Sequence, residues 1–162
     1  MREIKFRAWD KENKKMIYSN EIYPSSSYKF EFELLDGYKF ILSKIVDRIN
    51  TKDNLGNEHI VECFEKVDAE IMQYTGIKDD EGNEIYEGDI VEISNENSST
   101  EFLGMVSFDD GIFTLNAKER FCYMSKHRIL KMHSYRILGN IYENKELEKK
   151  HEFTRWNSLN YF

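Results

Sequence analysis

The sequence predicts a mainly β protein, a β-rich α+β fold in which antiparallel hairpins are accompanied by one or two short helices. Eleven phenylalanines and ten tyrosines stand against a single proline. Aromatic residues favour strands, whereas proline interrupts them. Apolar and polar residues alternate over several short segments, as half-buried strands require. Turn-forming Gly-Asn and Asp-Gly pairs lie between these segments.

The N-terminal part of the chain begins with three expected strands. Residues 4–8 alternate in hydropathy, and an apolar run resumes at 16–18 after the polar segment 10–15, which predicts a hairpin. Aromatic or apolar side chains then alternate with charged ones over residues 28–34. The Asp36-Gly37 pair that follows indicates a turn at the end of this strand.

Residues 39–50 predict a helix. The apolar positions recur at the i, i+3, i+4, i+7 spacing of one helical face, although β-branched residues are frequent among them. These positions are Tyr38, Ile41, Leu42, Ile45, Val46 and Ile49.

Further strands are expected in the rest of the chain, with Asp109-Asp110-Gly111 as a tight turn. Their ranges are 59–67, 70–75, 89–95, 101–108, 111–116 and 120–124. A short helix around residues 125–132 and a strand over residues 135–142 complete the predicted elements.

This pattern divides the chain into an N-terminal β-rich part at 1–67, a compact sheet or SH3-like small barrel at 68–147, and a C-terminal tail at 148–162. Gly88-Asp89 precedes an apolar strand, as in many SH3-like barrels, where the aspartate bonds local backbone amides. The independence of the two larger parts stays open, because residues 4–8 could pair with the last strand.

Two loops, Lys52–Glu58 and Lys78–Glu84, share an opening aspartate and a Gly-Asn pair. Turn chemistry explains the likeness, because aspartate can accept hydrogen bonds from backbone groups two residues on and glycine tolerates positive φ. The second loop resembles the first half of an EF-hand. A calcium site is rejected, because position 6 is Glu84 instead of glycine and position 12 is Ile90 instead of glutamate.

The sequence predicts no catalytic, metal or cofactor residues. Cys122, His127 and His133 lack the paired ligand spacing of a zinc site. The chain contains no nucleophile elbow, phosphate loop or His-Glu-x-x-His motif. Cys63 and Cys122 lie far apart inside apolar runs, which favours free buried thiols and a reducing cytoplasm. No apolar stretch approaches the ~20 residues of a membrane span.

Charge patterning gives a candidate interaction surface. The net charge of −7 opposes attraction to a polyanion, but residues 117–136 are basic and carry interleaved aromatic residues that could stack on bases. The tail adds a further aromatic candidate, in an apolar stripe expected to dock on this subunit or a neighbouring one. The candidate residues are Lys118, Arg120, Phe121, Tyr123, Lys126, Arg128, Lys131 and Trp156.

Three blocks of sequence resemble the YopX family of phage and prophage proteins. They are MREIKFRAWD at the start, MQYTGIKDDEGNEIYEGDIVEI in the middle and ILGNIYENKEL near the end, and they bracket residues 1 to about 147. The resemblance implies a temperate phage or prophage origin, a bacterial cytoplasm and a β-rich fold, with no catalytic residues to carry over. The chain departs from the family at Lys145, where proline is common, and in the tail HEFTRWNSLNYF.

The leading functional hypothesis is a non-enzymatic accessory protein that binds an unknown host or phage protein, or itself as a homo-oligomer. It follows from the resemblance, from the absence of catalytic constellations and from the many aromatic residues, which suit interfaces. A nucleic-acid-binding module that uses residues 117–136 is the alternative, disfavoured by the net charge. An enzyme is the third hypothesis. No membrane partner is expected.

Overall fold

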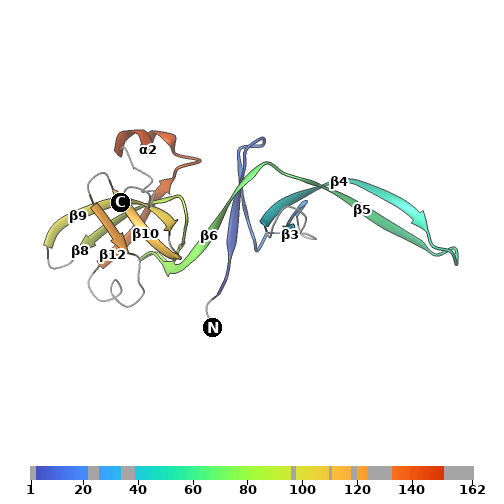
Figure 1. The fold of residues 1–162 in the computed structure, drawn as a ribbon, viewed down its shortest axis with the longest axis horizontal. Coiled ribbons are helices and arrows are strands. Elements are labelled where there is room, and N and C mark those ends of the chain that lie inside the picture. The colour runs from blue at the N-terminus through green and yellow to red at the C-terminus, as the bar shows by residue number, and fades with distance from the viewer. Residues whose placement is uncertain are drawn as a thin grey trace, which may run out of the picture. The chain divides into compact units, whose positions relative to one another are not determined.

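The computed structural model describes residues 3–21, 26–33, 39–95, 98–109, 111–117, 120–123 and 133–151 (Figure 1). It is mostly β, with antiparallel sheets and one short helix in the described ranges, which confirms the predicted fold class. The chain divides into two compact units. Unit 1 contains residues 1–5 and 72–162, and unit 2 contains residues 6–71.

Unit 2 begins with the predicted hairpin of β1 (Phe6–Asp10) and β2 (Lys15–Tyr18). The strands are antiparallel, with Arg7 opposite Tyr18 and Asp10 opposite Lys15. The buried Asp10 carboxylate organises the turn, because it accepts hydrogen bonds from the backbone N–H of Glu12 and Asn13 at 3.0 and 2.9 Å. The Tyr28 hydroxyl donates to the same carboxylate at 3.0 Å. The small core of this unit is centred on Ala8, Ile17, Tyr28 and Leu42.

The rest of unit 2 is a three-stranded sheet of order β3-β4-β5. Its strands are β3 (Tyr28–Glu33), β4 (Lys39–Lys52) and β5 (Glu58–Lys66). The helix predicted at residues 39–50 is therefore wrong. Consecutive residues Leu42 and Ser43 are both buried, so β4 is covered on both faces at this point and lacks the alternation that marks a half-buried strand. A bulge between Ile45 and Asp47 further disrupts the period of two.

Unit 1 contains the remaining strands, of which β6 starts in the last residues of unit 2. They are β6 (Ala69–Lys78), β7 (Glu84–Tyr86), β8 (Asp89–Asn95), β9 (Ser98–Asp109), β10 (Ile112–Ala117), β11 (Arg120–Tyr123) and β12 (His133–Asn140). Five of them form an antiparallel sheet of order β11-β10-β9-β8-β12. All six strands predicted from residue 70 onward are present, although several start or end a few residues away from the prediction.

Aliphatic and aromatic side chains of strands between β6 and β12 form the core of unit 1, among them Ile77, Ile85, Val91, Leu115 and Tyr135. The predicted turn at Gly88-Asp89 is present. Gly88 has φ +78°, and the buried Asp89 carboxylate accepts the backbone N–H of Tyr86 at 2.8 Å. The aspartate therefore bonds a local amide, as the sequence predicts.

Helix α2 (Lys145–His151) is an element that the sequence did not predict. Its first turn carries Glu146 and Glu148, which interact favourably with the positive end of the helix dipole. Leu147 packs against a second small core of Ile90, Met105 and Ile141. The short helix expected around residues 125–132 and most of the tail lie outside the described residues.

Candidate interaction surface

The most exposed part of unit 2 is a two-stranded extension of its sheet. β3 pairs with β4 only as far as Lys44, so beyond this point β4 and β5 form a ribbon of two strands (Figure 1). We call residues 46–62 the distal ribbon. Five of its apolar side chains are exposed: Val46 by 52%, Ile49 by 48%, Leu55 by 87%, Ile60 by 62% and Val61 by 46%. A segment that leaves this many large apolar groups in water is a candidate binding surface.

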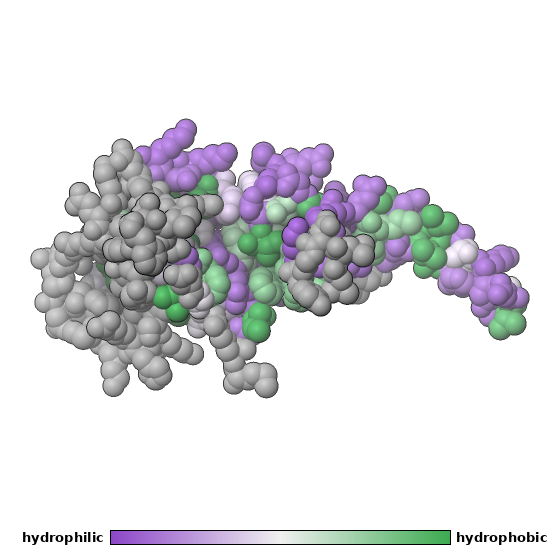
Figure 2. Space-filling view, in the orientation of Figure 1, coloured by the Kyte–Doolittle hydropathy of each residue, from purple (hydrophilic) through white to green (hydrophobic). Residues whose placement is uncertain are grey.

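The exposed apolar groups lie on both faces of the distal ribbon. Ile49 is directly opposite Val61, so these two share one face. Ile60 is opposite Asn50 and points to the other face, because successive side chains of a strand alternate. In Figure 2, hydrophobic patches are interspersed with hydrophilic ones along this part of unit 2. Neither face alone is a simple hydrophobic surface.

The outer edge of β5 offers backbone hydrogen-bonding groups. β5 is the last strand of its sheet, and no described strand pairs with its outer side. The Asp53 N–H donates to the Asn57 carbonyl at 3.0 Å, and the Val67 N–H donates to the Leu42 carbonyl at 2.8 Å. Odd-numbered residues of β5 therefore turn their backbone groups toward β4. The even-numbered residues turn theirs toward the outer side of β5, and they are Glu58, Ile60, Glu62, Phe64 and Lys66.

Charged side chains cross-link the two strands of the ribbon. Arg48 Nε lies 3.0 Å from Glu62 Oε1, and Lys52 Nζ lies 3.1 Å from Glu58 Oε1. Both are exposed pairs, each of which contributes about 0.2–1 kcal/mol at most. A two-stranded hairpin is marginally stable in water, so these pairs and the loop at its tip hold the ribbon together only weakly.

The tip of the ribbon is the first of the two similar loops found in the sequence. The Asp53 carboxylate accepts the backbone N–H of Leu55 at 2.8 Å and of Asn57 at 2.9 Å, and Gly56 has φ +85°. Hydrogen bonds from Asn57, first from its side chain and then from its backbone, hold the pKa of Asp53 below its usual value. This arrangement gives the tip a defined turn.

The second loop has the same geometry in unit 1. The Asp79 carboxylate accepts the N–H of Glu81 at 3.1 Å and of Asn83 at 2.7 Å, and Gly82 has φ +89°. The interpretation of both loops as aspartate-organised turns is therefore confirmed. No group of three or more His, Cys, Asp or Glu residues that could hold a metal occurs within the described ranges.

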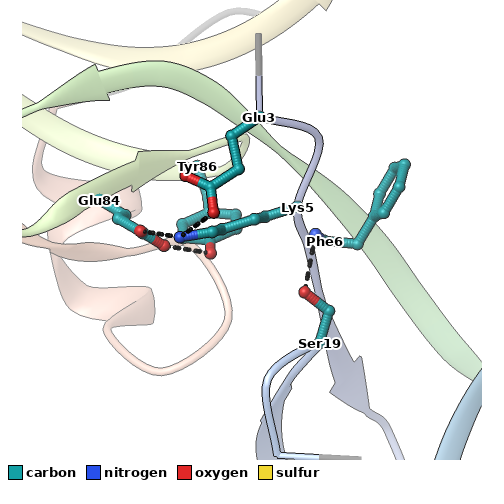
Figure 3. A network of polar contacts seen from close by, with 6 residues as sticks. All are labelled: Glu3, Lys5, Phe6, Ser19, Glu84 and Tyr86. Atoms are coloured by element: carbon teal, nitrogen blue, oxygen red, sulfur yellow. Dashed lines mark hydrogen bonds and ion pairs between the residues drawn. The ribbon is translucent and has the colours of Figure 1, made fainter. Parts of the chain in front are cut away.

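A second polar cluster lies in unit 1 around Lys5 (Figure 3). Lys5 Nζ is 2.5 Å from Glu84 Oε1 and 3.1 Å from Glu3 Oε1, and the Tyr86 hydroxyl donates to Glu84 Oε2 at 2.8 Å. Burial raises the pKa of Glu84, but the hydrogen bonds from Lys5 and Tyr86 outweigh burial and leave the pKa below its usual value. The hydrogen bond to Glu84 in turn raises the pKa of Lys5.

The Lys5 cluster has a structural role in the described chain. The Lys5 carbonyl also accepts the Tyr74 N–H at 2.9 Å, so residues 3–5 are fixed to β6 by backbone and to β7 by charge. Lys5 and Glu84 are 79 positions apart in the sequence, and no sequence motif indicates that they meet. Each charge in the cluster is satisfied by a neighbouring group.

Most of the candidate interaction residues predicted from the sequence lie outside the residues that the structure describes. Arg120, Phe121 and Tyr123 belong to β11, an edge strand that pairs with β10, and only their backbone is described. Lys118, Lys126, Arg128, Lys131 and Trp156 lie outside the described residues. Their grouping into one surface stays a prediction. Cys63 is a free thiol, as expected, but it is partly exposed instead of buried.

Sequence reasoning missed the distal ribbon because it assigned β4 to a helix. One signal could have found it. Ile45, Val46 and Ile49 on one side of the Asp53–Asn57 turn, and Ile60 and Val61 on the other, are β-branched residues flanking a turn that contains Gly-Asn. That pattern is typical of a hairpin.

Comparison with known proteins gives a family and two similar structures. Residues 5–148 match the model of the family described as YopX protein. The crystal structure of protein EF1440 from Enterococcus faecalis is 26% identical, with a TM-score of 0.54, and the alignment covers 91% of this chain and 99% of that one. The crystal structure of yopX from Bacillus subtilis is 19% identical, with a TM-score of 0.56, and coverage of 91% and 98%. The curated proteins contain no match.

Proposed function

Because the chain belongs to the YopX family, we propose that it is a non-enzymatic phage or prophage accessory protein that binds a protein partner or itself through the distal ribbon. The observation that carries the proposal is the open edge of β5, a strand on which Ile60 and Val61 are 62% and 46% exposed. The proposal places the protein in the bacterial cytoplasm.

The physical argument rests on what an unpartnered ribbon lacks. Full burial of an Ile or Val side chain is worth about 1.5–3 kcal/mol relative to full exposure, so each half-exposed side chain of the ribbon leaves a substantial fraction of that free energy unused. An added strand on the β5 edge would satisfy its outward N–H and carbonyl groups and cover these side chains. Strand addition of this kind is a recurrent mode of protein recognition.

The nature of the described polar clusters supports binding over catalysis. The Lys5 cluster and the two aspartate loops use their charged groups to hold local structure.

No helix in the described part of the chain has the length and apolar character needed to cross a bilayer.

The test of this proposal is a charge placed on the ribbon. The variant Ile60→Arg and the matched control Ile4→Arg, which changes an equally exposed isoleucine of unit 1, are used as bait in bacterial cells in which the phage is induced. We expect Ile60→Arg to lose the partners that wild type and Ile4→Arg retain, and to lose any self-association seen in sedimentation. Equal retention by all three proteins would refute the role of the ribbon.

The alternative function, nucleic-acid binding through residues 117–136, makes a different prediction. Wild type would be retained on a single-stranded oligonucleotide at low salt, with a steep loss as salt rises. Replacing Lys126, Arg128 and Lys131 by Glu would abolish that retention. Absence of salt-sensitive retention in wild type removes this alternative.

A further inference from the structure

We propose that the partner of the distal ribbon is a second copy of this chain, bound by antiparallel pairing of β5 with β5 about a two-fold axis at Glu62. This inference rests on the proposed function and names its partner. It follows from three properties of β5: its open edge, the direction of its backbone groups, and the order of its side chains.

The backbone allows only certain registers. In a two-fold pair the same edge meets itself, so outward-facing residues must be opposite outward-facing residues. The outward residues of β5 are the even-numbered ones from Glu58 to Lys66. The registers that meet this requirement and pair most of β5 have the two-fold axis near the middle of the strand, at Val61, Glu62 or Cys63.

The side chains select the axis at Glu62. This register places Ile60 opposite Phe64 of the second copy, and Val61 opposite its Cys63, so apolar groups meet apolar groups on both faces. An axis at Val61 instead places Ile60 opposite Glu62. An axis at Cys63 places Glu62 opposite Phe64. Both of these registers bury a carboxylate against an apolar group.

Charges at the ends of the strand favour the same register. Glu58 is then opposite Lys66 of the second copy, and His59 is opposite Glu65, so both ends of the interface pair an acidic residue with a basic one or with histidine. Lys66 and Glu58 also keep a partner in their own chain. Lys66 lies 2.7 Å from Glu33, and Glu58 lies 3.1 Å from Lys52. The new pairs extend these contacts without a like-charge contact.

One like-charge contact remains at the axis, where Glu62 meets Glu62. Arg48 of each chain offsets it, since its guanidinium lies 3.0 Å from the Glu62 carboxylate on the neighbouring strand. The four side chains then form a row of positive, negative, negative and positive charge across the joined sheet. We expect this row to weaken the dimer relative to an uncharged residue at position 62.

Disulfide trapping tests the register. Glu62→Cys is made in a background of Cys63→Ser and Cys122→Ser, so that the new thiol is the only one in the chain. Residues that exchange hydrogen bonds across an antiparallel pair have Cα atoms about 5.5 Å apart, within the range of a disulfide. We expect mild oxidation to convert Glu62→Cys to covalent dimer. The same background with Glu58→Cys is the control, because the proposed register separates its two thiols by about 27 Å.

A mixing experiment sharpens this test. Glu58→Cys and Lys66→Cys are opposite each other in the proposed register, so a mixture should form the mixed disulfide at least tenfold faster than either protein forms a homodimer. Glu62→Lys should abolish the sedimentation dimer, and Glu62→Thr should tighten it at least threefold. Circular dichroism and thermal melting of each variant show that it is folded.

The results separate the two proposals. Trapping at position 62 and in the mixture, with loss of the dimer in Glu62→Lys, supports the inference. A wild-type monomer at all concentrations, or trapping of Glu58→Cys alone, overturns it. If the monomer still captures a protein in a manner that depends on Ile60, the ribbon keeps its proposed function with a different partner. If nothing depends on Ile60, both proposals fail.

Discussion

The five-stranded sheet of unit 1 and the distal ribbon of unit 2 are both antiparallel and both contain many β-branched residues, yet they bury them very differently. Val91 and Val106 in the sheet are at most 1% exposed, whereas Ile60 and Val61 in the ribbon are about half exposed or more. Strand-forming residues and good pairing are common to both. What differs is the layer of side chains that covers the sheet, and the comparison teaches that burial depends on that layer.

The largest expected effect separates the two regions directly. Leu115 is fully buried, so Leu115→Ala should lower the free energy of unfolding by about 2–5 kcal/mol through lost burial and the cavity that is left. Val61→Ala on the ribbon should change it by about 0.5 kcal/mol or less. Urea denaturation measures both, at a protein concentration low enough to avoid self-association. If Val61→Ala lowered the free energy of unfolding by nearly as much as Leu115→Ala, the contrast between the sheet and the ribbon would be wrong.

The two aspartate loops provide a matched pair for the next prediction. Asp79→Ala should lower the free energy of unfolding by about 1–3 kcal/mol, because the Asp79 carboxylate is buried and its removal leaves part-buried backbone donors without an acceptor. Asp53→Ala at the exposed ribbon tip should cost less than about 1 kcal/mol, because water replaces the carboxylate there. Thermal melting of the two variants gives the ranking, and a reversed order would contradict the argument from burial.

Acid titration should show the contribution of the Asp79 carboxylate to stability. Burial raises the pKa of Asp79, but hydrogen bonds from Asn83, Ile137 and Glu81 outweigh burial and lower the pKa below its ordinary value of 3.8. A lowered folded pKa contributes stability above about pH 4 that is lost as the pH falls through the folded value. We expect Asp79→Asn to lose less stability than wild type between pH 4 and pH 2. Melting temperatures across this range measure it, and parallel curves would oppose the prediction.

The smallest expected effect concerns the ribbon's own charges. Arg48→Ala removes the pair with Glu62, but the arginine side chain is 63% exposed, so the free energy of unfolding should fall by about 0.5 kcal/mol or less. Amide hydrogen exchange should nevertheless become faster in β5 than in β8, because the ribbon has few other contacts that oppose local opening. Unchanged exchange in β5 would show that the ribbon is held more firmly than its contacts suggest.

The candidate site was only partly within reach of the sequence. The turn at its tip was predicted, because an aspartate followed by Gly-Asn organises its own backbone. The exposure of Ile60 and the open edge of β5 were not, because they depend on which elements pack on the ribbon and on the strand order β3-β4-β5, which leaves the outer side of β5 without a described strand. The Lys5 cluster was not predicted either, because strands that are distant in sequence bring Lys5 and Glu84 together.

The sequence by itself determined the β-rich class, strand β8 at residues 89–95, and the turns at Asp53 and Asp79. These features depend on the alternation of apolar and polar residues, on turn residues, and on hydrogen bonds from backbone to side chain. All of them act within a few positions of the chain. Only the tertiary structure decided that residues 39–52 are a strand. Their apolar spacing fits a helix as well as a strand that is covered on both faces only around Leu42 and Ser43. Pairing with β3 and β5 outweighs that local ambiguity.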